Sequence, residues 1–184
     1  MSSAGARYPA EYEADILLRD GSTAHLRPAR PTDREAVEAL YERLSEHGRL
    51  MRFHRSVHDL PEEILEPVLK PDYKTGLVLL AVHEERVIGL ARYRRSGTRV
   101  GHADIAFTVE ESHQHLGLAT QLLYQLAVAA RDQGVGVFEA DVLAENEEML
   151  DVLRDSGFVL ASTLKAGTHH ITFPIGEAPR PAYG

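Results

Sequence analysis

Residues 102–126 read HADIAFTVEESHQHLGLATQLLYQL, and this stretch combines a strand pattern, a polar link and a helix pattern. Residues 102–109 alternate in polarity and are rich in β-formers, which predicts a strand that ends at Val109. From Ala119 onward, apolar residues recur at spacings of three and four, which predicts a helix that opens near Gly117. The link between the two elements is therefore a loop that leads from a strand into a helix N-terminus, Gln114-His115-Leu116-Gly117-Leu118-Ala119.

A loop of this kind can hold a phosphate group. The first N–H groups of a helix lack intrahelical partners, and the helix dipole adds about half a positive charge at that end. Gly117 lets a ligand approach the backbone, and Ala119 is nearly as small. The loop is neither a P-loop, because no GK[ST] follows, nor a dinucleotide-binding G-x-G-x-x-G motif. The alternative interpretation is a helix-opening glycine that binds nothing.

The other segments alternate between strand and helix patterns. Strand patterns cover residues 14–19, 23–27, 76–83, 86–94, 135–142, 158–164 and 169–173. Helix patterns cover residues 32–45 and 145–156, with a broken helix over 46–70 that is interrupted at Pro61 and Pro67. Tight hairpins are expected at Asp20-Gly21 and Ala166-Gly167. Thr32 and Glu35 predict a capping box at the start of the first helix.

This order of elements favours one mixed α/β domain, in which helices cover a central sheet. We place the domain at residues 13–175. Residues 1–12 are expected to form a flexible leader, and residues 176–184, which read GEAPRPAYG, a flexible tail.

The composition limits the class of protein. The chain has 184 residues, of which 28 are acidic and 20 basic, so its formal net charge is −8. The acidic balance argues against a nucleic-acid or anionic-membrane partner, which needs a basic face. The absence of cysteine excludes disulfides, thiolate zinc sites and an acyl-thiol intermediate. Because no apolar run suits a signal peptide or the ~20 residues that span a bilayer, we expect a cytoplasmic protein.

The loop resembles a motif of a known family. Q/R-x-x-G-x-G/A between a strand and a long helix is the pyrophosphate loop of the GNAT acetyltransferases, and Gln114, Gly117 and Ala119 occupy its three defining positions. The family's N-x-x-A-x-x-x-Y-x-x-x-G-F helix is similar to a later segment, Asn146-x-x-Met149-x-x-x-Leu153-x-x-x-Gly157-Phe158. The order of elements fits the family from about residue 23 to 173.

Three further segments resemble the GNAT domains of bacterial protein-lysine acetyltransferases: residues 26–31, 49–53 and 103–109. The resemblance implies a mixed, mostly antiparallel sheet flanked by helices. It also implies direct, acetyl-CoA-dependent N-acetylation of an amine. The implied acceptor is a protein lysine, with an acyl-CoA synthetase as a candidate partner, because those enzymes often act on such synthetases. They are often fused to a ligand-sensing domain.

The resemblance also implies roles for individual residues. The backbone of Phe107, Thr108 and Val109 would pair with the pantetheine arm like an added strand. Asn146 would lie near the same arm. Beside Gln114, the amides of the loop and the first helical turn would hold the pyrophosphate, from His115, Leu116, Gly117, Leu118, Ala119 and Thr120.

Acetyl transfer to an amine of pKa ~10.4 needs a proton acceptor near neutral pH. In the resembling lysine acetyltransferases a Glu on this strand serves as the base, and Asp104 stands at the matching position. Asp is one methylene shorter, which favours a bridging water. The alternative for Asp104 is a carboxylate that hydrogen-bonds a loop.

The chain departs from the family pattern at three positions. His115 and Leu116 replace the usual Gly and Arg or Lys, so the loop lacks a cation near the phosphates, for which protonated His115 would substitute in part. Leu153 replaces the Tyr that protonates the departing thiolate in many members. The protein-lysine group that this chain resembles often lacks that Tyr as well.

Two side-chain clusters suggest other ligands. The paired histidines do not match a zinc spacing, so we expect no metal site at His113 and His115 or at His169 and His170. Four arginines cluster on one predicted hairpin, where a solvated face is the default interpretation: Arg92, Arg94, Arg95 and Arg99. A docking patch for an acidic surface or the CoA 3′-phosphate is the alternative.

Two other functions fit the same fold. The first is N-acetylation of a small amine, such as a polyamine or an aminoglycoside. The second is a non-catalytic acyl-CoA-sensing module, which the loop departures and the shortened carboxylate of Asp104 favour. A screen of acceptors separates the first from lysine acetylation, and acetyl-CoA binding without turnover would indicate the second. The sequence does not fix the oligomeric state.

Overall fold

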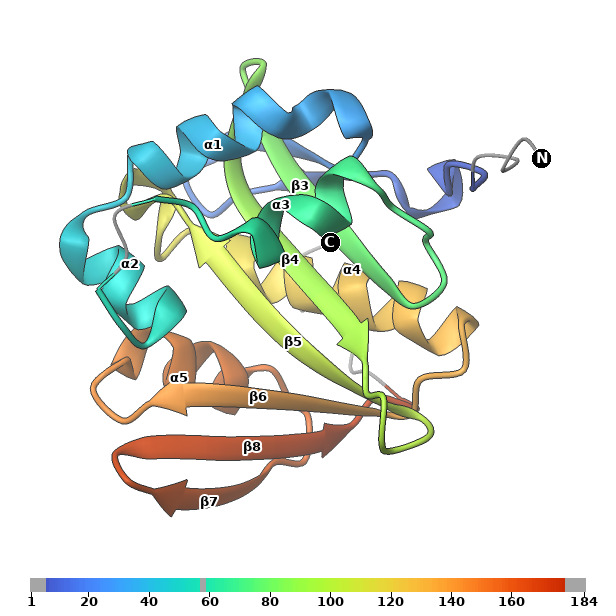
Figure 1. Cartoon of the computed structure of the whole chain (residues 1–184). Helices are drawn as coiled ribbons and strands as arrows, with labels where there is room; N and C mark the ends of the chain where they lie inside the picture. Colours follow the sequence, from blue (N-terminus) through green and yellow to red (C-terminus); the bar gives the residue numbers. More distant parts are fainter. Residues whose placement is uncertain (1–5, 57–58, 178–184) are drawn as a thin grey trace.

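The computed structural model of the chain describes residues 6–56 and 59–177 (Figure 1). Its centre is an eight-stranded sheet with the order β1-β2-β3-β4-β5-β6-β8-β7. The strands are β1 (Ala14–Leu17), β2 (Thr23–Pro28), β3 (Gly76–His83), β4 (Arg86–Arg95), β5 (His102–Val109), β6 (Val137–Leu143), β7 (Ala161–Lys165) and β8 (Thr168–Pro174). Neighbouring strands in this sheet pair antiparallel, except that β5 and β6 pair parallel. The predicted mixed, mostly antiparallel sheet is confirmed.

Helices cover both faces of the sheet. They are α1 (Arg34–Glu42), α2 (Glu46–Phe53), α3 (Glu62–Leu69), α4 (Leu118–Asp132) and α5 (Glu147–Asp155). The helices α4 and α5 enclose one hydrophobic core, and α1 and α3 enclose a second core on the opposite face (Figure 1). Leu122 and Leu126 on the inward face of α4 are fully buried, as the apolar spacing in the sequence predicts.

The strands β5 and β6 separate soon after they meet. They pair only from His102 to Asp104, opposite Val137 to Glu139, although β5 continues to Val109. Beyond Asp104 the two strands diverge and open a wedge at the middle of the sheet (Figure 1). The edge of β5 that faces β6 is therefore free of strand pairing over its second half.

Side chains alternate along β5 between the two faces. Ile105 and Phe107 belong to the core beneath α4. Asp104 and Thr108 point the other way, since residues two or four apart share a face, and the hydroxyls of Thr108 and Tyr41 of α1 lie 2.9 Å apart. Asp104 therefore projects from the sheet face that carries α1.

Two local predictions in the first half of the chain are wrong. The predicted capping box of Thr32 and Glu35 does not form. Instead, a single 3₁₀ turn covers Pro31–Asp33, and α1 begins only at Arg34. Asp33 accepts two hydrogen bonds from Arg27, at 2.7 and 2.8 Å, and one from the Arg30 amide. This half-buried ion pair fixes the turn, and a pattern of neighbouring residues does not reveal it.

The second wrong prediction is the break at Pro67, which lies inside α3. Proline removes one N–H and crowds the preceding turn. The short helix continues through it because Ile64, Leu65 and Val68 bury their side chains in the second core.

The start of the domain lies before residue 13. A 3₁₀ turn, Ala10–Tyr12, packs on the sheet, and Tyr12 is buried. The Tyr12 hydroxyl donates to Asp132 at 3.2 Å, and Gln125 donates to the Tyr12 carbonyl at 2.9 Å. The predicted flexible leader, residues 1–12, therefore wrongly includes residues 10–12, which pack on the sheet. Residues 1–5, and the predicted tail from residue 178 onward, lie outside the described residues.

The helices of the described ranges are too short or too polar for a bilayer. None of them meets the length and hydropathy needed to cross a membrane.

Candidate active site

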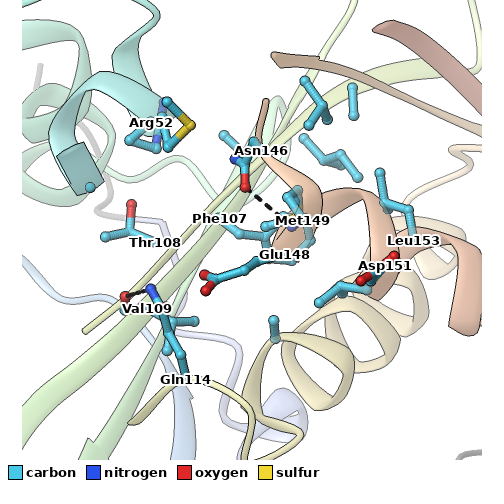
Figure 2. Close-up of a pocket in the computed structure, with 18 of the residues that line it drawn as sticks. Arg52, Phe107, Thr108, Val109, Gln114, Asn146, Glu148, Met149, Asp151 and Leu153 are labelled. Carbon is cyan, nitrogen blue, oxygen red and sulfur yellow. Dashed lines mark hydrogen bonds between the residues drawn. The ribbon is translucent and has the colours of Figure 1, made fainter. Parts of the chain in front are cut away.

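A cavity of about 1000 Å³ fills the wedge between β5 and β6. Its walls come from α2, β5, the loop before α4, the first turn of α4, β6 and α5. Every predicted site residue except Leu116 lines it. Two segments that the sequence singled out independently, around Gly117 and around Asn146, therefore face one space (Figure 2).

The N-terminus of α4 opens into this cavity. Gly117 caps the helix with a φ of +84°, a conformation that glycine adopts readily. Its carbonyl accepts the first helical hydrogen bond, from the Gln121 amide at 3.1 Å. The amides of Leu118, Ala119 and Thr120 have no intrahelical acceptor because they precede that first bond. An end of this kind is suited to hold an anion.

Leu116 differs from its neighbours in the loop. Its side chain packs against the core beneath α4 and does not line the cavity. Its carbonyl accepts a hydrogen bond from the Arg19 amide at 3.0 Å. The predicted binding role of Leu116 is thus limited to its backbone amide, and its side chain fixes the loop on the sheet.

His115 takes the left-handed conformation, with a φ of +63°. This explains why a glycine suits the position, because a left-handed non-glycine residue is strained by about 1 kcal/mol. The ring Nε2 lies 3.2 Å from Glu148 Oε1, and both side chains are exposed. Glu148 therefore competes with a phosphate for the charge of a protonated His115 ring.

Arg19 lies beside the loop and was missed from the sequence. It lines the cavity, and a Cβ built on Gly117 would lie 3.6 Å from its Nε. Arg19 follows β1 and precedes the predicted Asp20-Gly21 turn, about a hundred residues before the loop. No local pattern could reveal this contact, because it arises when the β1–β2 hairpin docks next to α4.

Gln114 ties the end of β5 to the loop. Its side-chain amide nitrogen donates to the Val109 carbonyl at 3.2 Å (Figure 2). This bond occupies one of the acceptors on the free half of β5. The backbone from Ile105 to Thr108 is the remaining part of that edge.

Asn146 caps α5 on the opposite wall of the cavity. Its Oδ1 accepts from the Met149 amide at 3.2 Å (Figure 2). The side-chain nitrogen of Asn146 has no protein partner among the described residues. Two turns further along α5, Leu153 is fully buried and presents only carbon to the site.

Asp104 and two other carboxylates follow one face of the sheet. Glu139 of β6 is buried and bound by Arg99, at 2.9 Å, and by His102. Asp141 accepts from His170 at 2.8 Å. Asp104 is exposed, and within residues 6–56 and 59–177 its carboxylate has no hydrogen bond or ion pair. Its position is compatible with proton transfer, and it does not act as a loop-binding carboxylate.

His54 is a second group in the cavity that could accept a proton. It follows α2 in a left-handed conformation. Burial lowers the pKa of His54, an effect that nearby Asp141 opposes and Arg52 reinforces. The lowered pKa favours the uncharged form of the ring. Sequence reasoning missed His54 because its proximity to β6 depends on how α2 docks.

Two glutamates beyond β5 fix the cavity walls. Glu111 accepts from the Ser45 amide at 3.0 Å and from the Ser45 hydroxyl at 2.6 Å, which binds the start of α2 to the loop. Burial alone would raise the pKa of Glu111, but these bonds outweigh it and hold the pKa below its usual range. Glu110 accepts from Arg43 at 2.7 Å and from Arg86 at 3.0 Å. Burial opposes the lowering of the Glu110 pKa, which the hydrogen bond from Arg43 causes.

The histidines and the arginine cluster are dispersed by the fold. Among the residues that the structure describes, no three His, Asp or Glu side chains form a metal-binding group. Arg99 binds Glu139, Arg95 lies exposed near Gly134, and Arg92 turns into the cavity. The interpretation of one solvated arginine face is therefore wrong for Arg92.

Comparison with known proteins defines the class. The model of the acetyltransferase (GNAT) family matches residues 34–158, which run from α1 through α5. The chain belongs to the GNAT acetyltransferase family, and the resemblance predicted from its motifs is confirmed.

Three individual proteins are similar to this chain. Acetyltransferase Pat of Mycolicibacterium smegmatis is 32% identical over 147 residues, which are 78% of this chain and 44% of that protein. The GNAT domain of S. lividans PAT is 31% identical, with a TM-score of 0.85 over 91% of this chain and 99% of that chain. A cAMP-binding acyltransferase from Mycobacterium smegmatis is 27% identical, with a TM-score of 0.63 over 94% of this chain and 52% of that chain. This chain thus spans less than half the length of the curated Pat protein.

Proposed function

We propose that this domain transfers an acetyl group from acetyl-CoA directly to the side-chain amine of a lysine in another protein. The observation that carries the proposal is the wedge between β5 and β6, which places a free strand edge beside the unpaired amides of α4. Similarity to Pat supports a protein lysine as the acceptor. The acyl-CoA synthetases expected from the resemblance are candidate acceptors.

The donor would lie along three parts of the wedge. The amides of Gly117 to Thr120 would hold the pyrophosphate at the end of α4. Arg19 would supply the cation that the loop lacks at Leu116. The backbone of β5 up to Thr108 would pair with the pantetheine arm, and the side-chain nitrogen of Asn146 would donate to it from the α5 side.

Asp104 would take the proton of the acceptor amine. The lysine ammonium first gives one proton to solvent, and its neutral Nζ then attacks the thioester carbon to form the C–N bond. The C–S bond breaks, the sulfur leaves as a thiolate, and the extra proton on the nitrogen passes to Asp104, directly or through one water. No proton donor stands at Leu153, which is compatible with a thiolate of pKa ~8.5 as the leaving group.

The test is an acetylation assay with a defined set of acceptors. The purified protein is incubated with acetyl-CoA and an array of lysine peptides, with spermidine and an aminoglycoside as competing acceptors. We expect release of free CoA thiol together with a mass gain of one acetyl group on lysine. Turnover on the small amines alone would overturn the lysine assignment. Saturable acetyl-CoA binding without turnover would indicate the sensing module instead.

A further inference from the structure

Two arginines lie in the cavity without partners. The Arg52 Nε and Nη2 atoms and the Arg92 Nε atom are buried, and none has a hydrogen-bond acceptor within the described ranges. Both side chains line the cavity. A buried guanidinium nitrogen without an acceptor costs free energy, so such groups are normally paired with a carboxylate or a phosphate.

The two arginines also repel each other. Burial lowers the pKa of Arg92, and the nearby charges of Arg52 and Arg94 lower it further. Glu63 opposes this effect from the start of α3, although no ion pair between Glu63 and Arg92 forms in the described structure. The Arg52 guanidinium lies 5.2 Å from the centre of the Phe53 ring, which leaves its nitrogens free to donate. Two neighbouring guanidinium groups without an acidic partner indicate a site for an anion.

The register of the sheet places this pair next to the reacting end of the wedge. Arg92 of β4 lies opposite Ala106, two residues further along β5 than Asp104 and on the same face. Strand spacing and rise put the Arg92 and Asp104 backbones about 8 Å apart. Arg52, near the end of α2, lines the same cavity as Thr108 and Asn146 (Figure 2). The pyrophosphate end at Gly117 lies beyond Val109, the C-terminal end of β5.

The size and chemistry of the pair fit a carboxylate. Guanidinium groups bind carboxylates through paired N–H donors, and a water-poor cavity strengthens this contact. The neighbouring surface at Asp104 and Asp141 is acidic and suits an ammonium group. The cavity therefore offers a positive site and a negative site whose backbones are about 8 Å apart, roughly the span of two extended residues.

We propose that Arg52 and Arg92 form a carboxylate subsite that selects one of the two substrates of the acetyltransferase. The carboxylate arrives either on the acyl chain, as in succinyl-CoA, or on the acceptor, as an acidic residue next to the lysine. This inference rests on the proposed function, because it needs an acyl-CoA in the wedge. The subsite would select substrates that carry a carboxylate, a selectivity that neither the loop motif nor Asp104 supplies.

The first arm of the test concerns the acyl chain. Calorimetry measures the affinity of wild type and of Arg92→Met for acetyl-CoA and for succinyl-CoA. Methionine keeps most of the volume of the arginine stem and removes the charge. If the acyl chain carries the carboxylate, Arg92→Met loses at least tenfold in affinity for succinyl-CoA and binds acetyl-CoA as wild type does.

The second arm concerns the acceptor. Initial rates are measured with acetyl-CoA and two lysine peptides that differ only in Glu or Gln beside the lysine. If the acceptor carries the carboxylate, Arg92→Met raises KM at least tenfold for the Glu peptide and leaves KM for the Gln peptide unchanged. Arg52→Met gives the same pattern. Arg95→Met is the matched control, because Arg95 is exposed on the same strand and lies outside the cavity.

A thermal melt separates binding from structure. Removal of one of two unpaired like charges raises the melting temperature of ligand-free Arg92→Met, whereas loss of a structural arginine lowers it. The proposal is overturned if wild type prefers neither succinyl-CoA over acetyl-CoA nor the Glu peptide over the Gln peptide. It is also overturned if such a preference persists in both Arg52→Met and Arg92→Met. If no lysine peptide reacts while acetyl-CoA binds, the lysine assignment fails, and the succinyl-CoA arm alone decides on the subsite.

Discussion

The carboxylate of Asp104 faces open space on the acceptor side of β5, while Glu139 and Asp141 on the same face are bound by other residues. We expect Asp104→Asn to lower kcat at least tenfold and to leave the affinity for acetyl-CoA within about twofold, because the amide cannot accept the amine proton. Steady-state rates and calorimetry measure the two effects. Full turnover of Asp104→Asn together with a tenfold loss in Asp141→Asn would transfer the base role to Asp141.

Arg19 and Glu148 place opposite charges at the phosphate end of the cavity. Arg19→Met should weaken acetyl-CoA binding by about fivefold at low salt, the size of one exposed ion pair of about 1 kcal/mol. Glu148→Gln should strengthen binding by a few-fold, because it removes a charge that repels the phosphates and competes for His115. Both effects should shrink at high salt. Equal affinities of the two variants at low salt would contradict this assignment.

At the residue scale, the sequence predicted the residues that belong to local motifs. Gly117 and Asn146, which two separate motifs singled out, line one cavity. Arg19 and Arg52 could not be predicted, because each reaches the cavity through the docking of a distant element. Leu116 was assigned to the site through its backbone amide, and its apolar side chain packs against the core.

The helix α2 depends on a glycine for a reason that helix propensity does not reveal. A Cβ on Gly48 would lie 2.5 Å from the Glu111 oxygen that binds Ser45. Gly48→Ala should therefore destabilise the protein by about 1 kcal/mol, whereas propensity alone predicts stabilisation by a similar amount. Urea unfolding measures the difference.

The control for this prediction is Gly48→Ala made in a protein that already carries Glu111→Ala. Without the carboxylate, Gly48→Ala should show the ordinary stabilising effect of alanine in a helix. A stabilising Gly48→Ala in the otherwise native chain would show that Glu111 moves aside at no cost, and the proposed link between α2 and the loop would then be unimportant.

At the element scale, the patterns predicted the strands best. The bounds of β3 and β5 agree with the predicted residues 76–83 and 102–109 because β-branched and apolar runs end at turns. The predicted start of α1 was wrong because the ion pair of Arg27 with Asp33 replaces the local cap. Helix ends that depend on such contacts between elements are not encoded in neighbouring residues.

The whole molecule should lose stability in mild acid. The pKa values of Glu110, Glu111 and Asp33 are lowered in the folded protein, since hydrogen bonds and ion pairs outweigh the effect of burial. A carboxyl with a lowered folded pKa stabilises the protein above its unfolded pKa of ~4, and this contribution disappears as the pH falls through the folded pKa.

The free energy of unfolding should therefore decline slightly below about pH 6.5, where the lowered pKa of His54 disfavours protonation in the folded state, and more steeply below about pH 4.5, where the carboxylates titrate. Urea titrations at a series of pH values measure it. Glu110→Gln should be less stable at pH 7 and show a shallower decline in acid. A stability that rises between pH 5 and pH 3.5 would contradict the role of these carboxylates.

The shape of the molecule was predictable only in part. The alternation of strands and helices indicated a covered sheet, and the family motifs indicated its mixed pairing. The wedge itself depends on where β5 stops pairing with β6, a point that no pattern of neighbouring residues marks. This long-range feature creates the cavity, and it makes the two motifs parts of one site.

Titration calorimetry with acetyl-CoA tests whether the wedge beside α4 binds an acyl-CoA. We expect one saturable site per chain, with a Kd between about 1 µM and 1 mM, the range usual for enzyme substrates. The affinity should fall in Arg19→Met and persist in Asp104→Asn. Absence of saturable heat up to millimolar acetyl-CoA would contradict the central claim that the wedge beside α4 is an acyl-CoA site.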